Sequence, residues 1–283
     1  MSMMERSFLG LGTHGFHLVA YTEWGAGANE RVVVCVHGLT RSGRDFDWIA
    51  EALESDFRVA CPDLPGAGRS HWLAQASEYG FARYLSDLAT LIARLGVDTV
   101  DVIGTSLGGV LGMMLAAQPN TPIRRLVLND IGAFVPKAGV QRISGEVGSE
   151  RAFASIEALE AHLRVALGPS GPLTEAQWRH LAEHGSRFDA ATSTWQLNYD
   201  PKLAHPLREG EQADFDLWSV WERVGCPVLV LRGAESDLLL KETAEEMLTR
   251  GPEAELIEFP GIGHAPMLMD SQQIEAVRTW LLT

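Results

Sequence analysis

One pentapeptide combines a nucleophilic side chain with the backbone that such a group needs. Gly104, Ser106 and Gly108 form the pattern G-x-S-x-G, which follows the apolar run 100–103 and precedes the small, apolar residues 109–117. A serine on a sharp turn between a strand and a helix projects its hydroxyl from the sheet edge, and neighbouring Cβ atoms would crowd that turn. The free N–H groups at the start of the helix favour negative charge. The pattern therefore predicts that Ser106 is a nucleophile.

A serine hydroxyl needs a base and a third group that orients the base. The pentapeptide alone arises by chance in roughly one chain in ten of this length, so these partners decide its meaning. His264 lies in a glycine-flanked loop after the apolar run 255–259, and Asp237 lies in the loop after the run 227–232. The carboxyl ends of parallel strands meet at one edge of a sheet. We therefore predict that His264 is the base for Ser106 and that Asp237 orients it.

Other acids and histidines leave alternatives open. Glu235 lies in the same loop as the predicted acid, and Asp130 ends the buried run 125–130, so either could serve instead. His37 comes directly before a flexible glycine, which favours a structural hydrogen bond over a role as base. Arg41 follows in the same loop, where a surface ion pair is expected more often than contact with an acidic substrate.

The elements that must position these residues alternate between strands and helices up to about residue 132. Continuous apolar runs typical of buried parallel strands are 31–37, 57–63, 99–104, 125–130, 227–233 and 255–260. Helices are expected from residue 45, at 81–95, after residue 106 and near the end of the chain, and a hairpin is expected over 6–23. The pattern predicts an α/β fold, with a mostly parallel central sheet and helices on both faces.

The alternation stops in the middle of the chain. From residue 134 to 223 no buried strand is expected, whereas helical stretches are expected at about 150–166 and 174–185. We interpret this segment as an inserted helical cap. The predicted division is a first core part over 1–133, the cap over 134–222 and a second core part over 223–283.

Composition excludes several classes of protein. The 283 residues carry a net charge of −14 and no basic run, which argues against a nucleic-acid partner or an anionic membrane surface. Cys35, Cys61 and Cys226 are too few for a disulfide framework, and no His or Cys stands beside them at metal-ligand spacing. The sequence predicts no cofactor and no metal. Without a signal peptide or membrane-length apolar run, a cytoplasmic monomer or homodimer is expected.

Five motifs in order resemble those of α/β-hydrolase-fold serine hydrolases. They are HGLTRSG, DLPGAGRS, GTSLGG, LRGAESD and PGIGHAPM, and together they span nearly the whole chain. The resemblance implies an α/β-hydrolase fold in which Leu39, after the first His-Gly pair, and Leu107, after the nucleophile, supply the N–H groups of an oxyanion hole. It also implies hydrolysis of a small to medium carboxylic ester through an acyl-enzyme.

Rival functions fit the same motifs. Similar enzymes hydrolyse a carbon–carbon bond in dienoates from aromatic-ring cleavage, although those usually carry more glycine and proline after His-Gly. Lactone hydrolysis, acyl transfer and a ligand-binding module on a hydrolase fold also remain open. An apolar pocket for a small-molecule ester needs aromatic residues, and Phe134, Trp195 and Trp218 in the predicted cap are the candidates.

Overall fold

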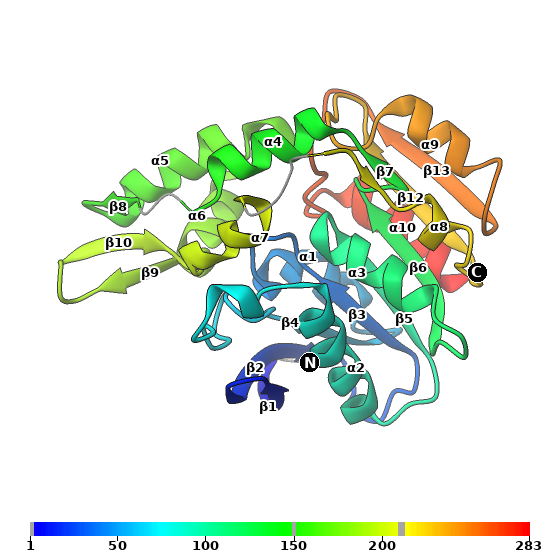
Figure 1. The fold of residues 1–283 in the computed structure, drawn as a ribbon, viewed down its shortest axis with the longest axis horizontal. Helices are drawn as coiled ribbons and strands as arrows, with labels where there is room; N and C mark the ends of the chain where they lie inside the picture. The colour runs from blue at the N-terminus through cyan, green and yellow to red at the C-terminus, as the bar shows by residue number, and fades with distance from the viewer. Residues whose placement is uncertain (1–2, 149–150, 209–212) are drawn as a thin grey trace.

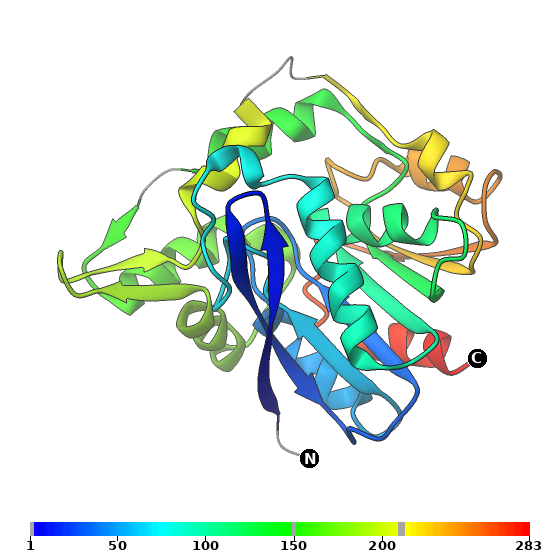
Figure 2. The ribbon, with the colours of Figure 1, turned by 60° about the horizontal axis from the view of Figure 1, so that its bottom comes forward.

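The core is an eight-stranded sheet whose strand order is β1-β2-β4-β3-β5-β6-β12-β13 (Figure 1). The structure is a computed structural model that describes residues 3–148, 151–208 and 213–283. The strands from β4 to β13 in this order pair in parallel, and β1 and β2 form an antiparallel hairpin at one edge, visible in Figure 2. The sheet strands are β1 (Met4–Gly12), β2 (Gly15–Trp24), β3 (Val32–Val36), β4 (Arg58–Pro62), β5 (Val100–Thr105), β6 (Ile123–Asn129), β12 (Val228–Gly233) and β13 (Ala254–Phe259).

Helices cover both faces of this sheet, because each central strand carries apolar side chains on both sides. All five residues of β3 are buried, for example. One face packs against α1 (Asp47–Leu53) and α10 (Ser271–Leu282). The other face packs against α2 (Phe81–Leu95), α3 (Leu107–Ala116), α8 (Trp218–Trp221) and α9 (Lys241–Met247).

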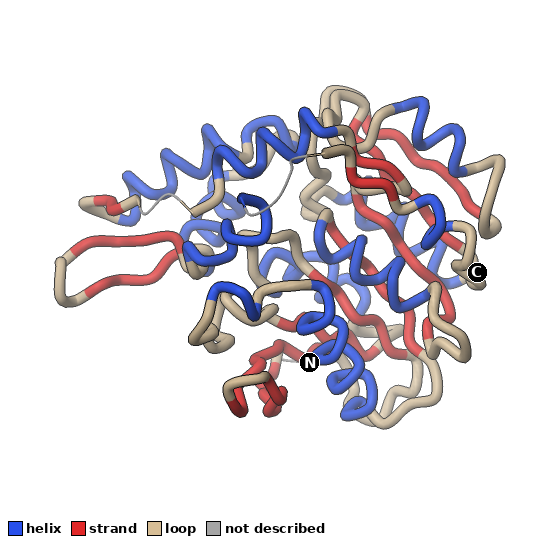
Figure 3. The backbone as a smooth tube through the Cα atoms, in the orientation of Figure 1, coloured by secondary structure: helices blue, strands red, loops and turns tan. Residues whose placement is uncertain are grey.

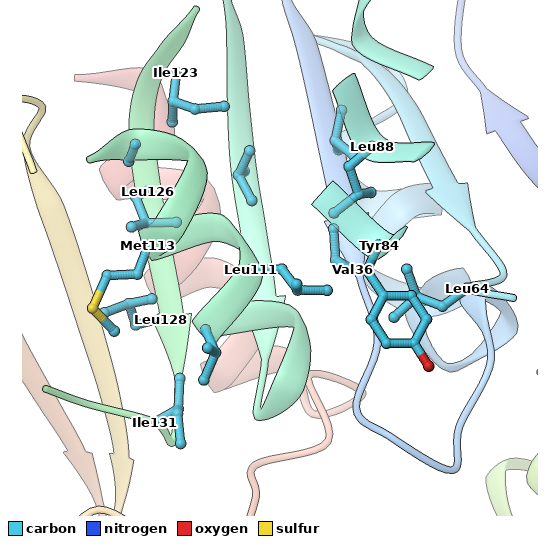
Figure 4. Close-up of a cluster of buried hydrophobic side chains, with 14 of the residues drawn as sticks. Val36, Leu64, Tyr84, Leu88, Leu111, Met113, Ile123, Leu126, Leu128 and Ile131 are labelled. Carbon is cyan, nitrogen blue, oxygen red and sulfur yellow. The ribbon is translucent and has the colours of Figure 1, made fainter. Parts of the chain in front are cut away.

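Helix α3, which follows Ser106, is held by apolar contacts with the sheet face on which it packs. Figure 4 shows Met113 of α3 beside Leu126 and Leu128 of β6, while Leu111 of the same helix points toward Val36 of β3. All five side chains are at most 1% exposed. The helix therefore has little freedom to shift relative to the strands, which fixes the position of its first turn.

A long segment is inserted between β6 and β12 and extends to one side of the sheet in Figures 1 and 3. Its helices before α8 are α4 (Lys137–Glu146), α5 (Ile156–Ala166), α6 (Glu175–His184) and α7 (His205–Arg208). Its strands are β7 (Phe134–Val135), β8 (Ala152–Phe153), β9 (Ser186–Asp189), β10 (Thr194–Leu197) and β11 (Phe215–Asp216). Short 3-10 turns complete the chain: η1 (Gly43–Phe46), η2 (Ala76–Glu78), η3 (Gly168–Ser170) and η4 (Pro201–Ala204).

The inserted segment carries helices, as expected of the cap, and it also contains an antiparallel sheet in the order β8-β10-β9, which was not expected. These strands are short and mostly not buried, so no continuous apolar run marks them. Helix α5 begins at residue 156, later than the predicted 150, which lies outside the described residues. The last helix of the predicted cap, α8, packs on the core through Trp221.

The predicted mostly parallel sheet with helices on both faces is confirmed. The expected hairpin over 6–23 is β1 and β2, and the expected helix over 81–95 matches α2. The short helix α9 was not predicted from the sequence. Three of its seven residues are acidic, so it shows no long apolar stripe.

Replacing Gly108 with alanine should destabilise the fold. A Cβ at Gly108 would lie 2.0 Å from the carbonyl oxygen of Val36, which is backbone and cannot move aside cheaply. We expect Gly108→Ala to lower the free energy of unfolding by at least about 2 kcal/mol. Gly145 lies in helix α4 with nothing within 4 Å of its Cβ position, so Gly145→Ala should be neutral or stabilise by about 0.5–1 kcal/mol. Urea unfolding measures the free energy of unfolding of both variants. Equal values for Gly108→Ala and Gly145→Ala would contradict the close packing of Gly108 on Val36.

Candidate active site

Ser106 lies at the sharp turn between β5 and α3, as its sequence pattern predicts. Its backbone has φ 53° and ψ −117°, a conformation that residues other than glycine rarely adopt. The turn is tight because a Cβ at Gly104 would lie 2.4 Å from the carbonyl oxygen of Gly108. The N–H of Ser106 donates to the carbonyl oxygen of Asn129 on the neighbouring strand β6, at 3.1 Å. The turn and the sheet together fix where the hydroxyl points.

His264 reaches Ser106 from the loop that follows β13. Its Nε2 lies 3.0 Å from the Oγ of Ser106, within hydrogen-bonding distance. Hydrogen bonds from both parts of the chain hold this loop: for example, the N–H of Gly263 donates to the carbonyl oxygen of Pro169, and the side-chain amide of Asn129 donates to the carbonyl oxygen of Pro266 at 2.7 Å. The imidazole is therefore attached both to the sheet and to the inserted segment.

The other nitrogen of His264 contacts Asp130, which directly follows β6. Its Nδ1 lies 2.8 Å from the Oδ2 of Asp130, a carboxylate that is completely buried. The same carboxylate accepts hydrogen bonds from the hydroxyl of Ser236 at 2.5 Å and from the N–H of Gly233 at 2.7 Å. An Nδ1–H bonded to Asp130 leaves the lone pair of Nε2 facing Ser106, which is the tautomer that a base requires.

The prediction that Asp237 contacts the histidine is wrong. Its carboxylate is half exposed and forms two hydrogen bonds with Arg142 of helix α4, at 2.5 and 2.8 Å. These bonds to the guanidinium lower the pKa of Asp237. In the loop after β12, Ser236 points inward to Asp130, while Asp237 on one side of it and Glu235 on the other are exposed. Of the acids considered from the sequence, Asp130 is the one in contact with His264.

The loop after β3 is held against the site by His37. The Nδ1–H of His37 donates to the carbonyl oxygen of Gly38 at 2.6 Å, and its Nε2 accepts from the N–H of Leu64 at 2.9 Å. Burial lowers the pKa of His37, so the ring is neutral at neutral pH. The predicted structural role of His37 is confirmed by these bonds.

The two residues expected to supply an oxyanion hole flank the serine. Leu107 is the first residue of α3, where a backbone N–H has no partner within the helix. Leu39 lies in the loop held by His37 and lines the cavity in front of Ser106. Their joint role stays a prediction, since it depends on where a substrate carbonyl lies.

Ser106 and His264 open onto a cavity of about 220 Å³ between the core loops and the inserted segment. Its apolar lining comes from both parts of the chain: Leu39, Phe46, Ile143, Val147, Leu163, Ala166, Leu167, Leu197, Pro266 and Met267. Charged residues also line it, and Arg41 is already bonded to Asp45 at 2.6 and 2.8 Å. The predicted ion pair of Arg41 is thus confirmed, but in the cavity wall, with both side chains about 15% exposed.

Comparison with known proteins agrees with this arrangement. A family model described as "Alpha/beta hydrolase family" matches residues 33–278. The chain belongs to the alpha/beta hydrolase family. It is 47% identical over 270 residues to a 3-hydroxybutyrate-oligomer hydrolase from Cupriavidus necator, covering 92% of this chain and 91% of that protein.

Solved structures of hydrolases are also similar over their whole length. An alpha/beta hydrolase from Novosphingobium aromaticivorans is 34% identical, with a TM-score of 0.87, and the match covers 99% of this chain and 98% of that one. A putative hydrolase from Rickettsia typhi is 29% identical, with a TM-score of 0.92, over 100% of this chain and 99% of that one. This hydrolase therefore shares its inserted segment as well as its core with solved structures.

The three aromatic residues expected in the pocket do not line the cavity of this hydrolase. Phe134 lies in β7, where it pairs with β11. Trp195 lies in β10 and packs against Phe188, with ring centroids 5.5 Å apart. Trp218 lies under the guanidinium of Arg250, 4.2 Å from the ring centroid. These side chains stabilise the segment and its attachment, and the cavity is lined instead by mostly aliphatic residues together with Phe46 and Tyr199.

Two further expectations can be compared with the described residues. The three cysteines are buried and free, so none forms a disulfide. Among the helices of the described chain, none combines the length and apolar character needed to cross a bilayer.

Replacing His37 should change how stability depends on pH. The folded protein holds His37 at a pKa below the 6.5 of an unfolded chain, so well above pH 6.5 neither state carries this proton. As the pH falls below 6.5, the unfolded chain binds the proton first and stability decreases. His37→Gln should lower the free energy of unfolding by about 1–3 kcal/mol at neutral pH, because two buried partners lose their bonds.

The same variant should lose stability less steeply than the wild type as the pH falls below 6.5. Urea unfolding across this range measures the slope. His71→Gln, which replaces an exposed histidine, is the control and should keep the wild-type slope. An unchanged slope in His37→Gln would contradict the neutral, buried state of the ring.

Proposed function

We propose that this hydrolase cleaves carboxylic esters through an acyl-enzyme, and that its substrates are short oligomers of a 3-hydroxy acid such as 3-hydroxybutyrate. The observation that carries the first part is the chain of hydrogen bonds from Ser106 through His264 to Asp130 at the wall of a cavity. The similarity to the 3-hydroxybutyrate-oligomer hydrolase over nine-tenths of both chains supports the second part.

The proposed first step forms an ester between Ser106 and the acyl part of the substrate. His264 Nε2 takes the proton of the hydroxyl as Oγ attacks the carbonyl carbon, and the negative charge on the carbonyl oxygen is bound by the N–H groups of Leu39 and Leu107. The protonated histidine then gives its proton to the leaving oxygen, which becomes the hydroxyl of the next 3-hydroxy acid unit. Asp130 stabilises the positive imidazolium between these transfers.

The second step releases the acyl group. A water molecule gives a proton to His264 Nε2 and attacks the acyl carbon, and the returning proton regenerates the hydroxyl of Ser106. The products are a free carboxylate and a free hydroxyl, so each turnover shortens an oligomer. This chemistry uses only residues of the chain and water.

The size and lining of the cavity favour short, moderately polar chains. Its volume of about 220 Å³ lies below the range of about 300–1,000 Å³ typical for drug-sized ligands. Aliphatic side chains suit the methyl and methylene groups of 3-hydroxybutyrate, while the charged groups at the wall suit its hydroxyl and carboxylate ends. Placing a long fatty acyl chain against these charged groups would be unfavourable, because the groups would lose contact with water.

The proposed role of Asp130 as the partner of His264 can be tested by a matched pair of variants. We expect Asp130→Asn to lower kcat by roughly three to four orders of magnitude, because the histidine loses its tautomer and its counter-charge. Asp237→Asn should keep kcat near the wild-type value, since it breaks only a half-exposed ion pair with Arg142. Circular dichroism checks that both fold. The opposite ranking of the two activities would contradict the role of Asp130.

The nucleophile and the substrate can be tested in one series. Dimers and trimers of 3-hydroxybutyrate and p-nitrophenyl esters from acetate to decanoate are incubated with the wild type and with Ser106→Ala. We expect a burst of p-nitrophenol equal to the enzyme concentration, lost in the variant, and a higher kcat/KM for the oligomers and short esters than for decanoate. Turnover of no ester by the folded protein would contradict the proposed activity. A burst without oligomer hydrolysis would contradict only the substrate.

A further inference from the structure

A second group of chemically active side chains lies where the core meets the inserted segment. His180 and His184 are four residues apart on α6, so they share one face of that helix. Asp47, the first residue of α1, faces them from the core. One ring nitrogen of each histidine and one carboxylate oxygen of Asp47 lie within 4.8 Å of one another. Two imidazoles and a carboxylate are a common ligand set for transition-metal ions.

Only one of the two carboxylate oxygens of Asp47 accepts a hydrogen bond. Its side chain is 9% exposed. Its Oδ2 accepts from the Nε of Arg44 at 2.7 Å, but its Oδ1 is buried without a hydrogen-bond partner among the described residues. A buried carboxylate oxygen without a donor is costly and favours an additional cation.

His184 offers a lone pair, and the rings of both histidines are packed in place. The guanidinium of Arg44 can only donate hydrogen bonds, so the Nδ1 of His184, which lies 3.4 Å from it, faces it with a lone pair, as a metal ligand must. The rings of His180 and His184 pack edge to face with centroids 4.4 Å apart, and Trp48 packs against His180 at 4.6 Å. Both imidazoles are therefore held in place before any ligand arrives.

One cation already occupies part of this group. The guanidinium of Arg44 contacts Asp47 at 2.6 Å and lies 3.4 Å from the Nδ1 of His184. The Nε2–H of His180 donates to the carbonyl oxygen of Arg44 at 2.9 Å. Any metal ion must compete with these contacts, and a divalent ion that replaces the guanidinium brings a second positive charge to the buried carboxylate.

We propose that Asp47, His180 and His184 bind a divalent transition-metal ion such as Zn²⁺ in exchange for the guanidinium of Arg44. Three protein ligands leave at least one position for water, as in sites that are not purely structural. Because the ligands come from α1 and α6, the bound ion would connect the core to the inserted segment. This site is separate from Ser106 and His264 and does not depend on the proposed esterase activity.

The test is calorimetric titration of the tag-free wild type with ZnCl₂, NiCl₂ and CoCl₂. We expect one ion per chain, with Co²⁺ bound more weakly than Ni²⁺, and a higher Tm with Zn²⁺ because the ion binds the folded state. His184→Ala should weaken Zn²⁺ binding at least about tenfold, and Asp47→Asn should act in the same direction. Arg44→Ala should tighten binding, because the competing cation is gone.

Matched controls separate this site from adventitious binding. His71→Ala removes an exposed histidine elsewhere and should leave Zn²⁺ affinity unchanged. The absorption of bound Co²⁺ should lack thiolate charge-transfer bands, which excludes the cysteines as ligands. Wild-type affinity in both His184→Ala and Asp47→Asn would overturn the proposal. Weaker binding in Arg44→Ala would also overturn it, because it would show that Arg44 does not compete with the ion.

Discussion

The backbone turn at Ser106 is the constraint on which the site depends. A serine at positive φ is strained, and it persists only where the surroundings leave the chain no alternative. Here the surroundings are backbone: Gly104 and Gly108 approach each other closely, and Gly108 lies against the carbonyl of Val36. Helix α3 cannot relax the turn by moving away, because it is packed on β6 and β3. The apolar core thus stabilises the position of one polar hydroxyl.

The buried carboxylate of Asp130 also depends on the backbone around it. A buried carboxylate without partners would be strongly destabilising, and this one accepts hydrogen bonds from Ser236, from the N–H of Gly233 and from His264. The first two donors belong to β12 and its loop, and the third belongs to the loop after β13. The strand order β6-β12-β13 brings these donors together at neighbouring strand ends. The parallel sheet is therefore what makes a buried negative charge tolerable beside the histidine.

The sequence predicted the strands of the central sheet, several helices that cover it and the positions of Ser106 and His264, because these follow from apolar runs and glycine-rich turns, whereas the short strands of the inserted segment follow from neither. The acid was harder to predict. Asp237 and Asp130 both lie at carboxyl ends of parallel strands, and the difference is which side chain the loop turns inward. In the loop after β12 the inward residue is Ser236, and Asp237 instead meets Arg142 of the inserted segment. Such a choice depends on tertiary contacts that no local pattern records.

The prediction that Phe134, Trp195 and Trp218 line the pocket was wrong for a related physical reason. Trp195 and Trp218 lie in short, half-exposed elements whose own stability requires large apolar contacts, so each packs on a neighbouring side chain, Phe188 or Arg250. The cavity is lined by aliphatic residues from α4 and α5 on one side and by the core loops on the other. The proposed reacting groups come from the core, whereas much of the cavity lining comes from the inserted segment. Differences in substrate between hydrolases of this fold can therefore arise in that segment without altering Ser106, His264 or Asp130.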